Sequence, residues 1–411
     1  QALLEEFDKV YVLNLRGNQR TAGEESRREG GKIFGSGSRS TVAVYFLVKS
    51  KTSKPGLGEL LYAEIGDYLT REQKLEKVSS WGDVLNVPWE RLTPDANGDW
   101  INKRDERYGS FIALGSKRGA ESRTVFRNFS LGVKTARDAW VNNVSEISLA
   151  ENMRRMLDHF NSQVEHAQSA KSQGAAWERD NDPKKISWNY ADTRRLEIGE
   201  KLSTQDFSIV PCMYRPFMET RLAFGAKVND AVYQLPKMFS KDSSTRAIAM
   251  TGVGAAVPFT AFMVSMIPDL SIFGSQSNTQ VFPESMLESP ATDEELGLFS
   301  ELSSGPGEEA LNLNVETIAL AEKALGRKIE SHEWFDYVYA VLNWPTFKSK
   351  YSVDLRKELP RVPLVKQFDL MAKLGSQLSA LHLNYEKLEE FPLEIQGGKL
   401  DELRVTKMKY G

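Results

Sequence analysis

The stretch of residues 10–49 constrains this chain most, because two strand-like runs flank a basic, glycine-rich segment. The first run, VYVLNL at 10–15, ends at once in Arg-Gly-Asn. The second run, TVAVYFLVK at 41–49, begins directly after the loop GGKIFGSGSRS at 30–40. Runs of β-branched and aromatic residues bounded by glycines and polar residues are typical of strands. We therefore predict two buried strands whose connection forms the edge of a functional cleft.

Length and cysteine content define the class of protein. With 411 residues the chain exceeds one typical hydrophobic core, so two or three domains are expected. The single cysteine, Cys212, rules out a disulfide within the chain and fits a reducing cytoplasm. The four histidines are scattered and have no cysteine near them, which argues against a structural zinc site. The sequence contains neither a membrane-spanning apolar run nor a signal peptide, so we expect no membrane partner.

The net charge of −3 argues against non-specific coating of nucleic acid, but the charges are unevenly distributed. Residues 101–137 carry nine Lys or Arg against three Asp or Glu, and residues 211–250 carry six against three. Residues 281–340 carry three against thirteen. This asymmetry suits a protein that grips a polyanion on one face. Solvated faces of opposite sign that pair with each other would produce the same pattern.

The chain begins with what reads as the end of a helix, at residues 1–7, and enters the first strand with no strand before it. This abrupt start suggests a fragment of a longer polypeptide. Residues 58–81 predict a strand and then a helix, with Thr70 as N-cap and Gln73 completing a capping box. Two prolines and an Asn-Gly-Asp turn then place a boundary near residue 81.

An apolar stripe predicts a helix at 146–170 that packs its stripe into the core. The stripe consists of Leu149, Met153, Met156, Leu157 and Phe160. Strands are predicted within 108–145 and at 207–217, 221–225, 246–254 and 259–267. Residues 310–390 are predicted to be mostly helical, with an extended break at 358–364.

Several long phrases of this sequence resemble one family. VYVLNLRGN, GGKIFGSGSRS and VAVYFLVK are similar to the distal part of a gamma-class DNA adenine methyltransferase, in the version found in type ISP and related single-chain restriction-modification enzymes. The same family is resembled by YAEIGDYLTREQKL, GDWINKRDERYGSFIALGSK, SLGVKTARDAWVNN, VPCMYRPF and the tail from YSVDLRKELPRVPL to LGSQLSALHLNYE. In such enzymes a target recognition domain follows the methyltransferase and reads a specific DNA sequence.

The resemblance implies a fold that mixes α/β and α+β parts. Residues 1–80 would be the distal part of the methyltransferase domain and contribute a partial sheet. Residues 81–411 would be an α+β target recognition domain, mainly helical over about 310–411. The implied partners are double-stranded DNA and the rest of the parent polypeptide, in a bacterial cytoplasm.

The motifs that the family needs for its chemistry are absent from this sequence. No glycine-rich S-adenosylmethionine loop, Asn-Pro-Pro-Tyr motif, P-loop, helicase motif or convincing nuclease cluster occurs. We therefore expect this chain alone to be inactive and to bind no cofactor or metal. S-Adenosylmethionine, ATP and magnesium would be bound by the parent, which the resemblance implies methylates adenine, with base flipping, and cleaves DNA in an ATP-dependent manner.

The glycine-rich loop carries an aromatic residue that would meet the DNA base. An enzyme that methylates a base extrudes it and covers its face, and Phe34 resembles the family's aromatic residue with that role. Packing of Phe34 beneath the sheet is the alternative. Gly35, Ser36, Gly37 and Ser38 would let the backbone approach phosphates, with amides or hydroxyls as donors.

Polar residues follow the carboxyl end of the first strand, where open α/β sheets bind their ligands. Arg16, Asn18 and Arg20 are predicted to line the cleft there, because Arg-Gly-Asn at a strand end has little packing value. Arg39 would bind a phosphate or a carboxylate of the cleft, with a plain surface arginine as the alternative.

Candidates for reading bases come from the basic segments. Arg and Lys suit guanine by bidentate geometry in the major groove, whereas Asn and Gln suit adenine. Each single residue is more often a phosphate contact or a solvated charge, so we expect only three or four to touch bases. The candidates are Lys103, Arg104, Arg107, Lys117, Arg118, Arg123, Lys134, Arg137, Arg221, Lys227, Lys237 and Arg246.

Two other functions stay open at this point. A complete but divergent S-adenosylmethionine-dependent methyltransferase, acting on RNA or a small molecule, would need a glycine-rich turn between a strand and a helix. The glycine-rich loop here precedes a strand instead, which counts against that function. A protein-interaction scaffold would fit the acidic, helical C-terminal part.

Overall fold

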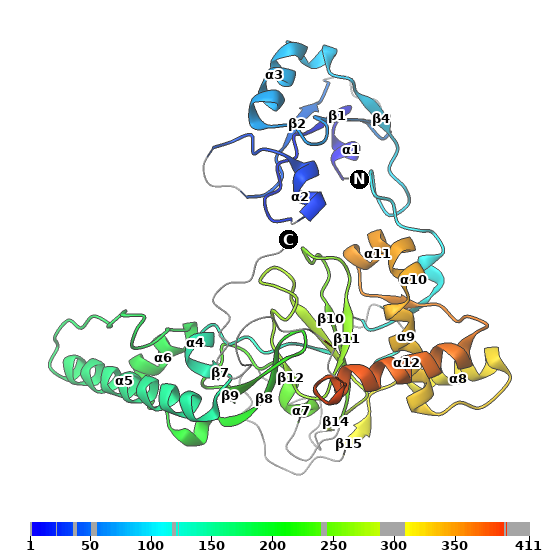
Figure 1. Cartoon of the computed structure of the whole chain (residues 1–411). Helices are drawn as coiled ribbons and strands as arrows, with labels where there is room; N and C mark the ends of the chain where they lie inside the picture. The colour runs from blue at the N-terminus through cyan, green and yellow to red at the C-terminus, as the bar shows by residue number, and fades with distance from the viewer. Residues whose placement is uncertain are drawn as a thin grey trace.

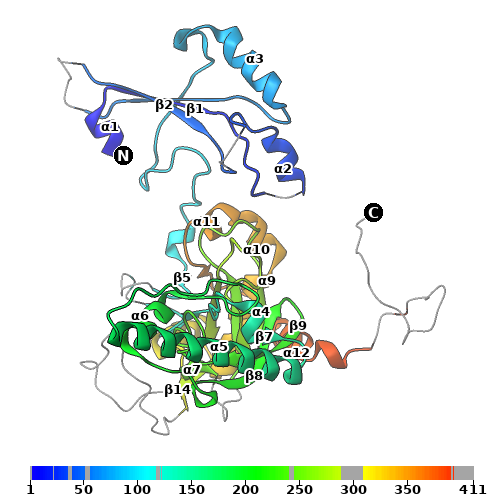
Figure 2. The ribbon, with the colours of Figure 1, turned by 90° about the vertical axis from the view of Figure 1, so that its left-hand side faces the viewer.

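The computed structural model describes residues 2–21, 23–35, 39–50, 56–116, 121, 123–239, 245–287, 309–389 and 392. Figure 1 shows a small N-terminal unit, coloured blue, and a larger C-terminal unit. An extended stretch, residues 93–107, leads from one unit to the other, and we call it the joining segment. The view in Figure 2, turned by 90°, shows the same separation.

The N-terminal unit is one four-stranded sheet with three helices. Its elements are β1 (Lys9–Asn14), β2 (Ala43–Val48), β3 (Glu59–Glu64), β4 (Glu90–Leu92), α1 (Ala2–Glu6), α2 (Gly23–Glu29) and α3 (Arg71–Trp81). The strand order is β2-β1-β3-β4. β1 runs antiparallel to β2 and parallel to β3, so the carboxyl ends of β1 and β3 meet at one edge of the sheet.

The predicted strands and helix of this unit form where expected, and Thr70 and Gln73 make the predicted capping box. One prediction is corrected. β2 is not buried, because it is the edge strand, and Tyr45 and Phe46 are more than 40% exposed. The sheet also includes β4, which lies beyond residue 80 and pairs with β3, while the domain boundary itself stays a prediction.

The C-terminal unit contains two further four-stranded sheets, in the orders β11-β10-β13-β6 and β12-β8-β9-β7. Their strands are β6 (Ser130–Leu131), β7 (Asn142–Asn143), β8 (Ser208–Arg215), β9 (Met218–Phe224), β10 (Ala247–Thr251), β11 (Ala261–Val264), β12 (Ile267–Pro268) and β13 (Thr279–Pro283). β8 and β9 form the predicted hairpin. Every residue of β10, β11 and β13 is buried, as expected for strands rich in apolar residues.

Two separate two-stranded sheets, β14-β15 and β16-β5, and a short helix accompany these sheets. Their elements are β5 (Ile112–Ala113), β14 (Ser285–Leu287), β15 (Glu309–Leu311), β16 (Arg361–Val362) and α7 (Leu235–Met238). Among the described residues of the region 108–145, which was predicted as strands, the strands β5, β6 and β7 are two residues long, and residues 138–141 form the helix α4.

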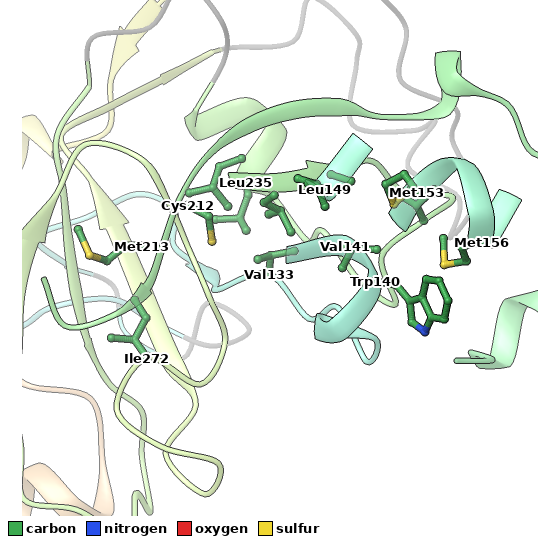
Figure 3. Close-up of a cluster of buried hydrophobic side chains, with 14 of the residues drawn as sticks. Val133, Trp140, Val141, Leu149, Met153, Met156, Cys212, Met213, Leu235 and Ile272 are labelled. Atoms are coloured by element: carbon green, nitrogen blue, oxygen red, sulfur yellow. The ribbon is translucent and has the colours of Figure 1, made fainter. Parts of the chain in front are cut away.

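The first hydrophobic core of the C-terminal unit lies beneath a long helix, α5 (Glu146–Ser172). The predicted stripe of this helix is buried throughout, from Leu149 to Phe160. Figure 3 shows Met153 and Met156 close to Trp140 of α4 (Asp138–Val141), with Cys212 of β8 in the same cluster. A further helix, α6 (Tyr190–Ile198), packs against α5.

The second core packs the helices near the C-terminus, which were predicted from the sequence, against β10, β11 and β13. These helices are α8 (Val315–Leu325), α9 (Ser331–Asn343), α10 (Pro345–Lys350), α11 (Ser352–Lys357) and α12 (Phe368–Leu383). α9 is buried from Trp334 to Leu342 and lies against α12 and β11. Gly375 permits the close approach of α12, because a Cβ there would lie 1.9 Å from the Asp336 carbonyl oxygen. The described helices include none that is long and apolar enough to cross a membrane.

The joining segment is fastened to α11. Asp99 binds Lys357 Nζ at 3.0 Å, and the backbone N–H of Asp105 donates to Asp354 Oδ1 at 3.2 Å. Lys357 Nζ also donates to the Asn102 carbonyl at 2.7 Å. Residues 99–105 of the joining segment are therefore bound to a helix that lies about 250 residues later in the chain.

A buried ion pair lies in the first core. Arg137 and Asp192 are hydrogen-bonded, and both side chains are 0% exposed. Asp192 also caps α6 and accepts from Arg195 Nη1 at 3.2 Å. Arg137 thus joins the segment before α4 to α6, and it is withdrawn as a base-reading candidate because DNA cannot reach it.

We expect Arg137→Met to lower the free energy of unfolding by about 3–5 kcal/mol, because it leaves the Asp192 carboxylate buried without its partner. Arg154→Met is the matched control, since Arg154 forms an exposed pair with Asp158 and should cost less than about 1 kcal/mol. Equilibrium urea denaturation of both variants measures the difference. Equal, small losses would show that the buried pair adds nothing to stability.

Candidate nucleic-acid interface

Arg16 lies at a sharp turn where β1 ends. Its φ is 54°, and the Asn14 side-chain oxygen supports the turn by accepting from the Arg16 backbone N–H at 3.0 Å. The guanidinium reaches Glu64 Oε2 at 2.6 Å and Asp67 Oδ1 at 2.9 Å, at the end of β3. Arg16 therefore braces the two strand ends, and its charge is engaged by protein carboxylates.

Asn18 shapes the next turn through backbone contacts. Its N–H donates to Glu29 Oε2 at 2.8 Å, and its side-chain oxygen accepts from the Arg20 N–H at 3.0 Å. The N–H of Gln19 donates to the Arg39 carbonyl at 2.8 Å. Arg20 and Arg39 are both exposed, so the structure brings these two predicted cleft residues to neighbouring surface positions.

The buried ammonium of Lys74, on α3, binds the backbone of the loop between β1 and the glycine-rich segment. It donates to the carbonyl oxygens of Leu15 at 3.0 Å, Glu29 at 2.7 Å and Gly31 at 2.8 Å, and the residue is 0% exposed. Burial lowers the pKa of Lys74. The three carbonyls oppose that shift, because they accept hydrogen bonds from the charged form.

Gly30 and Gly31 allow the backbone at the start of α3 to lie close to the loop. A Cβ at Gly30 would lie 2.2 Å from the Leu69 carbonyl oxygen, and one at Gly31 would lie 2.5 Å from the Arg71 backbone nitrogen. Only glycine tolerates such close backbone approach. The Gly-Gly pair was the sequence signal for this contact, whereas Lys74 resembled any other lysine of a charged helix.

Phe34 projects from this fastened loop. Ile33 before it is buried in the small core of the N-terminal unit, and its carbonyl accepts from Arg71 Nε at 2.9 Å. Phe34 itself is 59% exposed, which excludes the alternative that it packs beneath the sheet. Gly35 beyond it is exposed as well, while Ser36, Gly37 and Ser38 lie outside the described residues.

Five of the twelve base-reading candidates are wholly or partly exposed but engaged with nearby carboxylates. Lys134 binds Asp230 at 2.6 Å, and Arg221 binds Glu219 at 2.8 Å. The other pairs are Arg104 with Asp99, Arg107 with Asp105, and Lys227 with Glu200 and Asp206. Lys103 and Arg123 are exposed, Lys237 is half-buried, and Lys117 and Arg118 lie outside the described residues.

Arg246, another predicted base reader, is held by carboxylates of the C-terminal unit, and its role in base reading stays a prediction. Its guanidinium binds Glu284 Oε2 at 2.6 Å and Asp336 Oδ1 at 2.6 Å, and it lies 4.7 Å from the centroid of the Phe335 ring. These contacts join β10 to the end of β13 and to α9. Four of its five N–H donors are therefore engaged within the C-terminal unit, although the side chain stays 20% exposed.

The described residues include no group of three or more His, Cys, Asp or Glu that could hold a metal ion. The expectation that this chain binds no S-adenosylmethionine stays a prediction, and the carboxylates at the carboxyl edge of β1 and β3 are engaged within the protein. Glu64 there is bound by Arg16, Tyr62 and Asn14, and Asp67 is bound by Arg16. Because these carboxylates are satisfied internally, we assign no step to the cofactor in this chain.

Asp269, directly after β12, is a buried carboxyl with few partners. It is 4% exposed, accepts from the Ser271 N–H at 2.8 Å and lies 3.4 Å from Arg215 Nη1. Burial raises the pKa of Asp269 to about 6. The fold therefore favours the protonated form, and the stability gained from protonation is present at low pH and is lost as pH rises through about 6.

We expect Asp269→Asn to remove this pH dependence. Between pH 4 and 7 the unmodified chain should lose about 2–3 kcal/mol of stability relative to the variant, as a shift of roughly two pKa units implies. Urea denaturation at both pH values measures the change, with Asp158→Asn as the exposed control. Parallel pH profiles for the chain and Asp269→Asn would contradict the assignment.

A family model described as the Type ISP C-terminal specificity domain matches residues 124–411 of this chain. A search among curated proteins found no match. Structural comparison, in contrast, found relatives that extend into the N-terminal unit as well.

Three solved structures each match 95% of this chain. A nuclease-deletion mutant of the Type ISP restriction-modification enzyme LlaGI, in complex with a DNA substrate mimic, is 33% identical, with a TM-score of 0.77. The DrdV–DNA complex, determined by cryo-electron microscopy, is 28% identical, with a TM-score of 0.80. The ATP-dependent Type ISP restriction-modification enzyme LlaBIII bound to DNA is 28% identical, with a TM-score of 0.80. The chain covers 34%, 36% and 24% of these chains, respectively.

Proposed function

The chain belongs to the family of Type ISP C-terminal specificity domains, and from this premise we propose that it recognises a specific sequence in double-stranded DNA. One observation carries the proposal: three structures that contain DNA match both units of the chain over 95% of its length. This likeness favours DNA recognition over the two alternatives, a divergent RNA or small-molecule methyltransferase and a protein-interaction scaffold.

Recognition would use the exposed basic residues of the C-terminal unit and of the joining segment. Lys134 and Arg221 are paired with carboxylates at the surface, where such pairs are worth only about 0–1 kcal/mol. Exchange of a carboxylate for a phosphate or a guanine edge therefore costs little. Arg123 and Lys103 are exposed and can reach DNA without such an exchange.

The N-terminal unit would contact the base that is modified. Phe34 is an exposed aromatic residue on a fastened loop, and we assign it to stack on an extruded base. Arg20 and Arg39, exposed nearby, suit the flanking phosphates. This arrangement would divide the work, with sequence reading in one unit and base contact in the other.

The remaining chemistry belongs to a parent polypeptide of which this chain would be a part. We propose that the parent methylates adenine with S-adenosylmethionine and cleaves DNA with ATP and magnesium, in the bacterial cytoplasm. The methyltransferase, helicase and nuclease regions of that polypeptide would be the partners of this chain. Support comes from the family and from the matched relatives, since the chain covers only 24–36% of each.

Selection from a random duplex pool tests DNA recognition directly. We expect the 411-residue chain to enrich a single asymmetric sequence containing an adenine, at low and at moderate salt. Affinity for DNA should fall steeply with salt, because each phosphate contact releases a counterion. Loss of enrichment at both salt concentrations, for this chain and for the parent enzyme alike, would refute the proposal.

The stacking role of Phe34 has a separate test. In the parent enzyme, Phe34→Ala should abolish most of the fluorescence gained by 2-aminopurine at the target adenine, while the selected sequence stays the same. Tyr45→Ala is the control, because Tyr45 is an exposed aromatic residue of β2, in the same N-terminal unit as Phe34. Equal fluorescence in both variants would remove Phe34 from the site.

A further inference from the structure

We propose that Lys74 is the positioning residue of the DNA-facing loop, which holds Phe34 in place by binding three backbone carbonyls of that loop. The inference rests on the proposed function, because it explains how the stacking residue is held. Lys74 is fully buried and cannot touch DNA itself. Its action is therefore on the loop backbone.

The ammonium of Lys74 is buried, and a buried charge needs compensating interactions. A lysine is almost never fully buried unless it is partnered, because removing an ammonium from water costs much free energy. Here the three donors of the ammonium meet three acceptors, at 2.7–3.0 Å. An apolar side chain would fill the same space without that cost, so what the ammonium adds is directed binding.

The three carbonyls come from both ends of one loop. Leu15 follows β1, Glu29 ends α2, and Gly31 begins the glycine-rich stretch. By binding all three, Lys74 closes the base of the loop that contains Arg16, Asn18 and Arg20. The segment that carries Phe34 starts from the same base.

Arg71 extends the same contact towards the aromatic residue. It lies one helical turn before Lys74, on the same side of α3. Its Nε donates to the Ile33 carbonyl at 2.9 Å, and Ile33 directly precedes Phe34. α3 thus holds the loop at its base and at the residue next to the exposed ring.

Phe34 depends on this backbone support because its own side chain is mostly exposed. Packing fixes a buried aromatic ring, but a ring that is 59% exposed has little packing to fix it. A group that must meet a base needs a defined position before DNA arrives, since disorder in the free protein weakens the contact. The helix-bound backbone supplies that position.

The test is Lys74→Met in the full-length parent enzyme, with a duplex that carries 2-aminopurine at the selected adenine. Methionine matches the length of the lysine stem and removes the donors. We expect the fluorescence gain to fall about tenfold or more, as for lost hydrogen bonds to a charged group. The selected sequence should be unchanged, and amide exchange should accelerate at Gly17, Gly30 and Gly31, whose N–H groups bond within this loop or to Leu69.

Lys77→Met is the matched control. Lys77 lies three residues along α3 and also donates to a carbonyl, that of Ile65 at 2.8 Å, but it does not contact the loop. It should leave both the fluorescence gain and the exchange of the loop amides unchanged. Arg71→Met provides a second variant, since Arg71 is exposed and we expect its substitution to cost the fold little. It should lower the fluorescence gain several-fold even if Lys74→Met fails to fold.

These outcomes distinguish failure of the positioning role of Lys74 from failure of the stacking role of Phe34. A normal fluorescence gain in Lys74→Met and Arg71→Met, with the gain lost in Phe34→Ala, overturns the positioning role and leaves the stacking role intact. A normal gain in Phe34→Ala overturns the stacking role and, with it, this inference. A loss in Lys77→Met equal to that in Lys74→Met would show general destabilisation of α3, which also overturns the positioning role.

Discussion

Two buried cations, Lys74 and Arg137, and one half-buried cation, Arg246, bind distant acceptors and hold this structure together. Lys74 binds carbonyls 43 to 59 residues away, Arg137 binds an aspartate 55 residues away, and Arg246 binds an aspartate 90 residues away. Each charge leaves water, and only a complete set of oriented partners offsets that loss. A different path of the chain would leave one of these charges unpaired, so the three contacts penalise alternative arrangements of the same strands and helices.

The periodic elements could be predicted because their signals are local. The stripe of α5 and the capping box of α3 depend on residues three or four positions apart. The exposure of β2 and the pairing of β4 could not be predicted, because the burial of a strand depends on its neighbours in the sheet. The partner of β4 lies about thirty residues earlier, and no pattern within Glu90–Leu92 announces it.

The candidate site was predicted less well, for a related reason. Arg123 and Arg137 belong to one basic segment and look alike in sequence, yet one is exposed and the other is sealed beside Asp192. The charge of a segment therefore overstates the positive surface that it offers to DNA. The glycine-rich loop was recognisable from its composition, whereas its support was not, because only the fold distinguishes Lys74 from Lys77 on the same helix.

The attachment of the joining segment to α11 has a consequence for how such proteins diversify. Because Asp99 and Asp105 are held by Lys357 and Asp354, the segment that leads to the N-terminal unit is attached to α11 rather than to the two four-stranded sheets of the C-terminal unit. Under the proposed function, those sheets could change their reading residues, and so the preferred sequence, without altering this attachment. The helices near the end of the chain would then keep constant the number of base pairs between the modified adenine and the positions that are read.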